Sequence, residues 1–91
     1  MYYKRLDQVL STRINDDMVL LDAEGGYYHH MNPTGSAIWE ALERPLEISQ
    51  LVSALRTQYR IRNANIDSEV EAFLQELLVM GLIAAGDTPE L

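Results

Sequence analysis

The sequence predicts an α+β domain in which a three-stranded antiparallel sheet is followed by three helices. Two observations predict this order. Short apolar runs separated by turn residues fill the first third of the chain, and apolar residues at helical spacing fill the remainder. No repeat or low-complexity segment divides the 91 residues, so we expect a single domain over 1–91.

The three strands are expected over 7–14, 18–22 and 27–31. The turn Asn15-Asp16-Asp17 separates the first two, and Gly25-Gly26 leads into the third. The middle run is continuously apolar, which is typical of a strand that is covered on both faces. We therefore place 18–22 in the centre of the sheet and 27–31 at an edge, where its backbone is open to pairing with another chain.

The three helices are expected over 33–42, 48–59 and 67–80. The first follows the edge strand directly, with Asn32 as N-cap and Pro33 at the first helical position. The third is expected to be capped by Asn65 or Asp67 and to end at Gly81. Three strands followed by three helices in so short a chain suggest a winged helix-turn-helix-like arrangement.

The third helix carries a wider apolar face than packing on one core requires. Its apolar residues span an arc of roughly 160°, against a stripe of ~100° for a helix that packs on one core. One margin of the arc carries Phe73 and Met80 beside Glu69 and Glu76, and the other carries Leu74 and Leu78 beside Glu71. Either one margin faces a groove or the whole arc is buried, and the sequence does not choose between these arrangements.

The charge distribution argues against nucleic acid as a partner. The chain has 7 Lys and Arg against 14 Asp and Glu, a formal net charge of −7, and no cation follows Arg62. Nucleic-acid binding depends on Lys and Arg that neutralise phosphates, so an acidic C-terminal helix is repelled. A peptide with some positive charge is favoured instead, mainly in its rate of encounter.

Composition also excludes several classes of protein. The absence of cysteine excludes disulfides and thiolate metal sites. The N-terminus lacks the apolar segment of a signal peptide, and no apolar run approaches the ~20 residues that span a bilayer. We therefore expect a cytoplasmic protein that binds no membrane.

No pattern in the sequence predicts catalysis, a metal or a cofactor. The chain has no Ser-His-Asp arrangement at informative spacing and no glycine loop of the kind that cradles a phosphate. His29 and His30 point to opposite faces of a strand, and the sequence has no third histidine to complete a metal site. We therefore expect a small binding module and not an enzyme.

Three segments together resemble a known family. They are the strand–helix junction 28–42, the helical segment 70–77 and Gly81-Leu82-Ile83. This pattern covers nearly the whole chain and resembles the PqqD-like family, the leader-recognition domains (RiPP recognition elements) of ribosomally made, post-translationally modified peptides. A chain of this length with the junction Met31-Asn32-Pro33-Thr34-Gly35 is most similar to the discrete leader-binding B proteins of lasso-peptide pathways.

The resemblance implies a binding mode. The leader of a precursor peptide adds as a further strand to the edge at 27–31, which is β-augmentation, and its apolar side chains enter a cleft against the third helix. The implied peptide-binding residues are Tyr27, Tyr28, His29, His30 and Met31 on the strand and Val70, Phe73, Leu74 and Leu77 in the cleft, with Glu69 facing a leader cation or backbone amide. Alternation along the strand leaves open whether the Tyr28 side or the opposite side lines the cleft.

The resemblance also implies partners. The chain is then expected to be a non-catalytic adaptor that hands the leader to a separate processing enzyme, which for lasso pathways is a transglutaminase-like cysteine protease. Two alternatives stay open: an adaptor for a radical-SAM maturase, and an acidic winged-helix regulator. A free strand edge can also pair with a second copy, so both a monomer and a weak dimer are consistent with the sequence.

Overall fold

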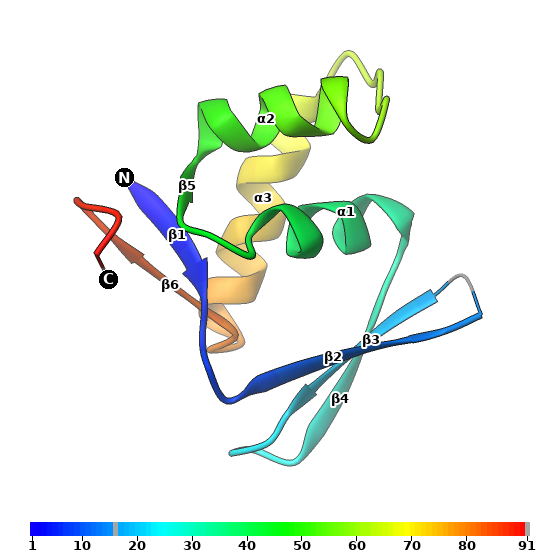
Figure 1. Ribbon diagram of the computed structural model, residues 1–91, viewed down its shortest axis with the longest axis vertical. Coiled ribbons are helices and arrows are strands. Elements are labelled where there is room, and N and C mark those ends of the chain that lie inside the picture. Colours follow the sequence, from blue (N-terminus) through cyan, green and yellow to red (C-terminus); the bar gives the residue numbers. More distant parts are fainter. Residues whose placement is uncertain (16, 91) are drawn as a thin grey trace.

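The computed structural model describes residues 1–15 and 17–90 (Figure 1). In chain order its elements are β1 (Tyr2–Arg5), β2 (Val9–Ile14), β3 (Asp17–Asp22), β4 (Tyr27–Met31), α1 (Pro33–Ala41), β5 (Leu46–Glu47), α2 (Ile48–Thr57), α3 (Ile66–Val79) and β6 (Ile83–Gly86). The predicted α+β class is confirmed, while the winged helix-turn-helix comparison stays a prediction. In the described part of the chain, no helix is both long and apolar enough to cross a membrane.

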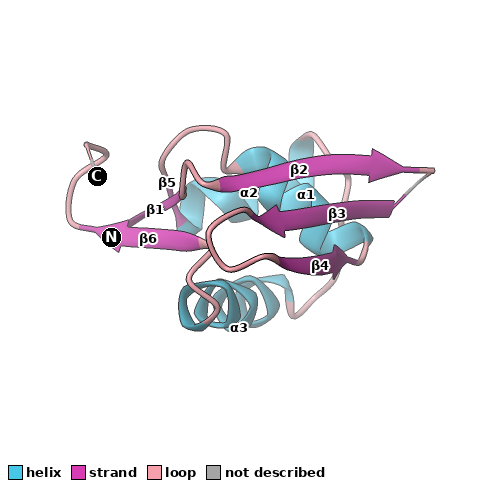
Figure 2. Ribbon diagram, turned by 90° about the horizontal axis from the view of Figure 1, so that it is seen from below, coloured by secondary structure: helices cyan, strands magenta, loops and turns pink. Residues whose placement is uncertain are grey.

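Three of the strands form the antiparallel sheet that the sequence predicts. Their order is β2-β3-β4, with β3 in the centre and β4 at an edge (Figure 2). The register pairs Met18 with Met31 and Leu20 with His29, so these four side chains share one face of the sheet. The turn expected at 15–17 includes Asp16, which lies outside the described residues.

A second antiparallel sheet, of order β5-β1-β6, corrects the prediction of a single sheet that precedes the helices. Here β1 pairs with β6 over four residues, from Tyr2 opposite Gly86 to Arg5 opposite Ile83. These strands are short; β1 and β6 lie near opposite ends of the described chain, and β5, of two residues, lies in its middle. No local alternation or turn residue marks such a pairing, because the hydrogen bonds join segments that are distant in sequence.

The capping residues that the sequence predicts are found at most of the helix ends. Asn32 caps α1, and its side-chain Oδ1 accepts a hydrogen bond from the Gly35 N–H at 2.7 Å. Asn65 holds the N-cap position of α3, although its side chain makes no capping hydrogen bond there. Gly81 follows the end of α3 with φ of +74°, a left-handed conformation that glycine adopts without steric cost.

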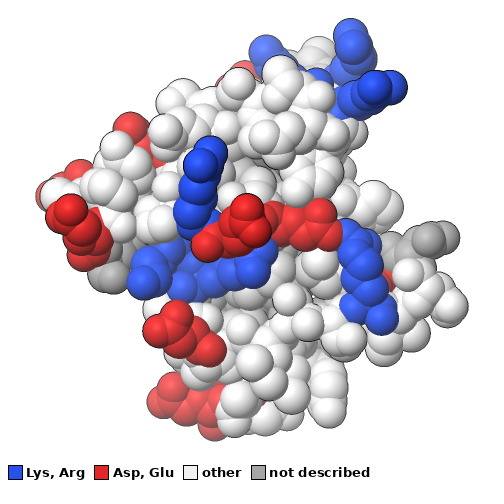
Figure 3. Space-filling model, in the orientation of Figure 1, with Lys and Arg blue, Asp and Glu red and all other residues white. Residues whose placement is uncertain are grey.

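Most basic side chains on the face shown in Figure 3 gather in two groups, while Arg13 of β2 lies apart and pairs with Glu40. One group lies around β1 and the segment after α1, where Lys4, Arg5 and Arg44 line a shallow depression. The other lies at the connection between α2 and α3, where Arg56 and Arg62 line a second one. Although the net charge is −7, most of the cations are therefore concentrated at two places.

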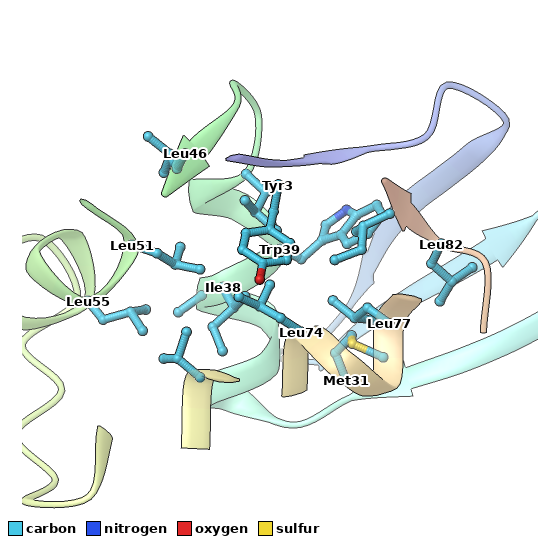
Figure 4. Packing of buried hydrophobic residues seen from close by; sticks show 14 of the residues in the cluster. Tyr3, Met31, Ile38, Trp39, Leu46, Leu51, Leu55, Leu74, Leu77 and Leu82 are labelled. Atoms are coloured by element: carbon cyan, nitrogen blue, oxygen red, sulfur yellow. The ribbon is translucent and has the colours of Figure 1, made fainter. Parts of the chain in front are cut away.

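One cluster of buried side chains joins the two sheets to the helices (Figure 4). Trp39 of α1 is 1% exposed and lies near its centre, with Tyr3 from β1 and Leu20 from β3 in the same cluster. The α3 residues Ile66, Val70, Leu74 and Leu77 have no exposed surface. The middle of the α3 apolar face is thus used for the core.

Arg5 connects the second sheet to the C-terminal end of α1 through hydrogen bonds. Its guanidinium donates hydrogen bonds to the carbonyl oxygens of Trp39 and Glu40, the Nε–O distance to Trp39 being 2.8 Å, and it lies 5.1 Å from the centre of the Trp39 ring. Carbonyls at a helix C-terminus lack partners within the helix, and a cation there also interacts favourably with the helix dipole. Burial lowers the pKa of Arg5, but an arginine stays charged at neutral pH.

We expect Arg5→Met to lower the free energy of unfolding by about 1–3 kcal/mol, because it leaves two helix-terminal carbonyls without their charged donor while keeping an apolar stem. Urea denaturation followed by circular dichroism measures the change. Arg44→Met is the control, since Arg44 is exposed and its loss should change stability by less than about 0.5 kcal/mol. Equal stability of the two variants would contradict this role.

Candidate functional site

A cleft of about 780 Å³ lies between the edge strand β4 and helix α3. Figure 2 shows β4 at the border of its sheet with α3 running alongside. Three elements build the walls: β4, the first turns of α1, and one side of α3. The lining residues are Tyr28, His29, His30, Met31, Asn32, Thr34, Gly35, Ile38, Glu69, Ala72, Phe73, Glu76 and Met80.

The backbone of β4 is unpaired on the cleft side. β4 is hydrogen-bonded to β3 along one edge, and no described strand pairs with its other edge. In an antiparallel pair, alternate residues direct their N–H and C=O groups away from the partner strand. The five residues of β4 therefore present a row of donors and acceptors about 17 Å long beside the cleft.

Side chains from both faces of β4 reach the cleft. Met31 is 6% exposed and shares the inner face of the sheet with the buried Leu20. Tyr28, by contrast, is 72% exposed on the outer face. Both residues nevertheless line the cleft, because it opens at the edge of the sheet and not over one face. Tyr27, at 68% exposure, lies outside the lining.

The structure selects the Phe73 and Met80 margin of α3 as the wall of the cleft. Phe73 is half-buried and Met80 is 37% exposed. The expected lining by Val70, Leu74 and Leu77 is corrected, since all three are fully buried in the core. A domain of this size has one central core, and the middle of the α3 arc is needed to fill it.

The start of α1 forms the floor beneath the Phe73 ring. A Cβ atom on Gly35 would lie 2.8 Å from Phe73 Cζ and 3.1 Å from Asn32 Oδ1. The absence of a side chain at Gly35 therefore lets the ring lie directly against the helix turn that Asn32 caps. The buried Ser36 hydroxyl donates to the Met31 carbonyl at 3.4 Å, which ties the same turn to the end of β4.

The sequence prediction omitted several lining residues, among them Asn32, Thr34, Gly35, Ile38, Ala72, Glu76 and Met80. Two signals point to some of them. Asn32-Pro33 starts a helix directly after β4, so the first turn of that helix must lie next to the strand end. Glu76 and Met80 belong to the predicted margin that contains Phe73. No pattern in the sequence indicates that the Phe73 ring and Gly35 are in contact.

The charged side chains of the cleft lining are carboxylates. Glu69 and Glu76 are exposed on α3, and Asn63 Nδ2 donates to Glu69 Oε1 at 2.6 Å. Among the described residues, no group of three or more His, Cys, Asp or Glu side chains is placed to hold a metal ion. The arrangement offers backbone hydrogen bonds, apolar surface and negative charge, a combination that suits an extended peptide.

The family model described as coenzyme PQQ synthesis protein D (PqqD) matches residues 17–83. The chain belongs to the PqqD family. In this PqqD-family chain the match runs from β3 through the three helices to the first residue of β6, and so includes every residue of the cleft lining. The family resemblance inferred from the sequence is confirmed.

Two solved structures are similar to this PqqD-family chain. TbiB1 in complex with the TbiA(beta) leader peptide has a TM-score of 0.77 and 28% sequence identity, covering 93% of this chain and 99% of that one. A lasso peptide synthetase B1 complexed with its leader peptide has a TM-score of 0.70 and 17% identity, covering 91% and 98%. At that identity, the second likeness shows the fold alone. No curated protein sequence matches the chain significantly.

We expect Gly35→Ala to push the Phe73 ring into the cleft, because the new Cβ would lie only 2.8 Å from Phe73 Cζ, which is closer than van der Waals contact allows. The ring is the movable end of a side chain, so the fold should be retained. The Phe73 ring resonances should shift in NMR spectra, while those of Leu51, in the core, should not. Unchanged Phe73 resonances in the folded variant would show that the ring does not lie on Gly35.

Proposed function

We propose that this chain binds the leader of a ribosomally made precursor peptide as an additional strand on β4, with leader side chains in the cleft against α3. The observation that carries the proposal is the unpaired edge of β4, which forms one wall of an apolar and acidic cleft. A strand edge gives main-chain affinity without demanding particular side chains, and the pockets beside it supply specificity. Tyr27–Met31, Phe73 and Glu69 are the predicted residues that remain in this site or beside it.

The comparisons support this choice of ligand. Both similar structures hold a leader peptide, and the TbiB1 likeness extends over almost the full length of both chains. The choice of a lasso-peptide pathway rests on the junction Met31-Asn32-Pro33-Thr34-Gly35, which resembles that of the discrete leader-binding B proteins of such pathways. Membership in the PqqD family is consistent with leader recognition as the shared role.

The energetics require apolar anchors in addition to the main-chain ladder. Two or three outward-facing residues of β4 offer about four to six hydrogen bonds, each contributing ~1 kcal/mol net. Ordering a disordered segment on binding costs ~2–5 kcal/mol or more. The ladder therefore does little more than offset this cost. Side chains that contact Phe73, Ile38 and Met80, at ~1.5–3 kcal/mol for each fully buried apolar residue, set the affinity.

We further propose that the chain is a non-catalytic adaptor for a separate processing enzyme in the cytoplasm. The site combines backbone groups, apolar surface and exposed carboxylates, which suits holding a peptide and not transforming it. In a lasso pathway the enzyme would be the transglutaminase-like cysteine protease that removes the leader. Copurification of the chain with that protease, dependent on the leader peptide, tests this step.

Proline substitution on β4 tests the edge directly. Neighbouring residues of the strand direct their N–H groups to opposite sides, so Tyr28→Pro and His29→Pro remove donors from opposite edges. The variant that loses the cleft-side donor should stay folded and bind the leader of the neighbouring precursor gene about tenfold more weakly or worse. The other should lose stability, because it breaks the pairing with β3.

Fluorescence anisotropy with the labelled leader and circular dichroism measure the two effects. Normal affinity in the variant that remains folded would contradict strand addition at this edge.

Two adjacent residues of α3 allow a binding role in the cleft to be distinguished from a packing role in the core. Phe73→Ala should weaken leader binding at least tenfold, since it removes the apolar wall of the cleft. Leu74→Ala, one position further, should instead lower the free energy of unfolding by about 2–5 kcal/mol and leave the affinity of the folded fraction unchanged. Thermal melts and titrations of both variants provide the comparison. The prediction fails if the two variants lose affinity equally.

A further inference from the structure

Acidic and apolar side chains alternate along the wall that α3 gives to the cleft. Glu69, Phe73, Glu76 and Met80 succeed one another at steps of four, three and four residues, and all four line the cleft. This spacing places them in one row on the helix surface. At 1.5 Å of rise per residue, neighbouring members of the row are about 4.5–6 Å apart along the helix axis.

An extended peptide has a somewhat longer repeat. Side chains on one face of a strand recur every second residue, at about 6.5–7 Å, which exceeds the helix spacing by roughly 1–1.5 Å per step. The flexible stems of Lys and Arg can span this difference, so a leader added to β4 can bring successive cleft-facing side chains to successive members of the α3 row. The leader side chain opposite Phe73 meets its aromatic ring. The leader side chains two residues before and after it meet the carboxylates of Glu69 and Glu76.

The charge of this row is not neutralised within the described residues. No Lys or Arg is among the lining residues, and the two basic groups around β1 and at the α2–α3 connection line other depressions (Figure 3). The Glu69 carboxylate accepts a hydrogen bond from the neutral Asn63, and the Glu76 carboxylate makes no hydrogen bond or ion pair with a described residue. Both carboxylates are thus available to a ligand in the cleft.

We propose that Glu69 and Glu76 select leaders in which Lys or Arg flanks the apolar anchor on the cleft-facing side, in the pattern basic–x–apolar–x–basic. This inference rests on the proposed leader binding and specifies the chemistry of the peptide. The apolar residue packs on Phe73, and each basic residue pairs with one carboxylate. An acidic or uncharged residue at a flanking position leaves that carboxylate without a partner and lowers affinity.

Peptide display separates this charge selection from binding itself. A library of random 12-residue peptides is selected on the wild-type chain, on Glu69→Gln/Glu76→Gln, and on the control Glu71→Gln. Glu71 is exposed on α3 and does not line the cleft, so the control removes negative charge without altering the site. Circular dichroism confirms that each variant is folded.

Peptides selected on the wild type and on Glu71→Gln are expected to carry Lys or Arg two positions before and after an apolar residue. Peptides selected on the double variant are expected to share only the apolar residue. A selected basic peptide should bind the double variant about 3–20-fold more weakly at low salt, with the difference shrinking at 0.5 M salt. Apolar anchors without basic neighbours on the wild type would overturn charge selection but not leader binding. A selection that yields no peptide competing for the cleft would contradict the proposed function itself.

Discussion

The unpaired backbone edge of β4 is the feature beside which α1 and α3 build the cleft. Exposed strand edges invite aggregation, and proteins usually cover or shorten them. Here β4 is only five residues long, and α3 lies across the opening at a distance that leaves a cleft. The first turn of α1 holds this spacing, because Asn32 caps the helix directly after the strand and the Ser36 hydroxyl bonds back to Met31. Within the described residues the edge therefore stays unpaired beside a cleft of about 780 Å³.

The helix α3 serves two purposes that compete for the same side chains. Its central apolar residues fill the core that joins both sheets, and only a margin remains for the cleft. Phe73 is the residue where the two meet, since it packs partly on the core and partly faces the open space. Gly35 makes this possible by letting the ring lie close to α1. A side chain at that position would collide with the Phe73 ring and displace it from α1.

The second sheet contacts α1 at the end of the helix that is far from the cleft. β1 and β6 bring the two ends of the described chain together, and Arg5 connects them to the last carbonyls of α1. The start of the same helix forms the floor of the cleft. Helix α1 therefore connects a structural contact at its C-terminal end to the cleft at its N-terminal end.

Features that depend on neighbouring residues could be predicted, and features that depend on distant ones could not. The meander of β2, β3 and β4, the Asn32 cap and the Gly81 stop follow from local turn and capping chemistry. The sheet formed by β1, β5 and β6 was missed because its strands are short and its pairs span the chain. Helical periodicity identified the α3 stripe with its two margins. It could not assign Val70, Leu74 and Leu77 to the core, because that depends on where α1 and α2 lie.

The most direct test of the central claim is amide hydrogen exchange along β4, with and without the leader peptide. In the free protein, the amides that face β3 should be protected and the alternating amides that face the cleft should exchange fast. Saturating leader should slow the second set specifically, because those amides then donate to the added strand. Cleft-side amides that are already protected in the free chain, or that exchange equally fast with the leader bound, would contradict the account.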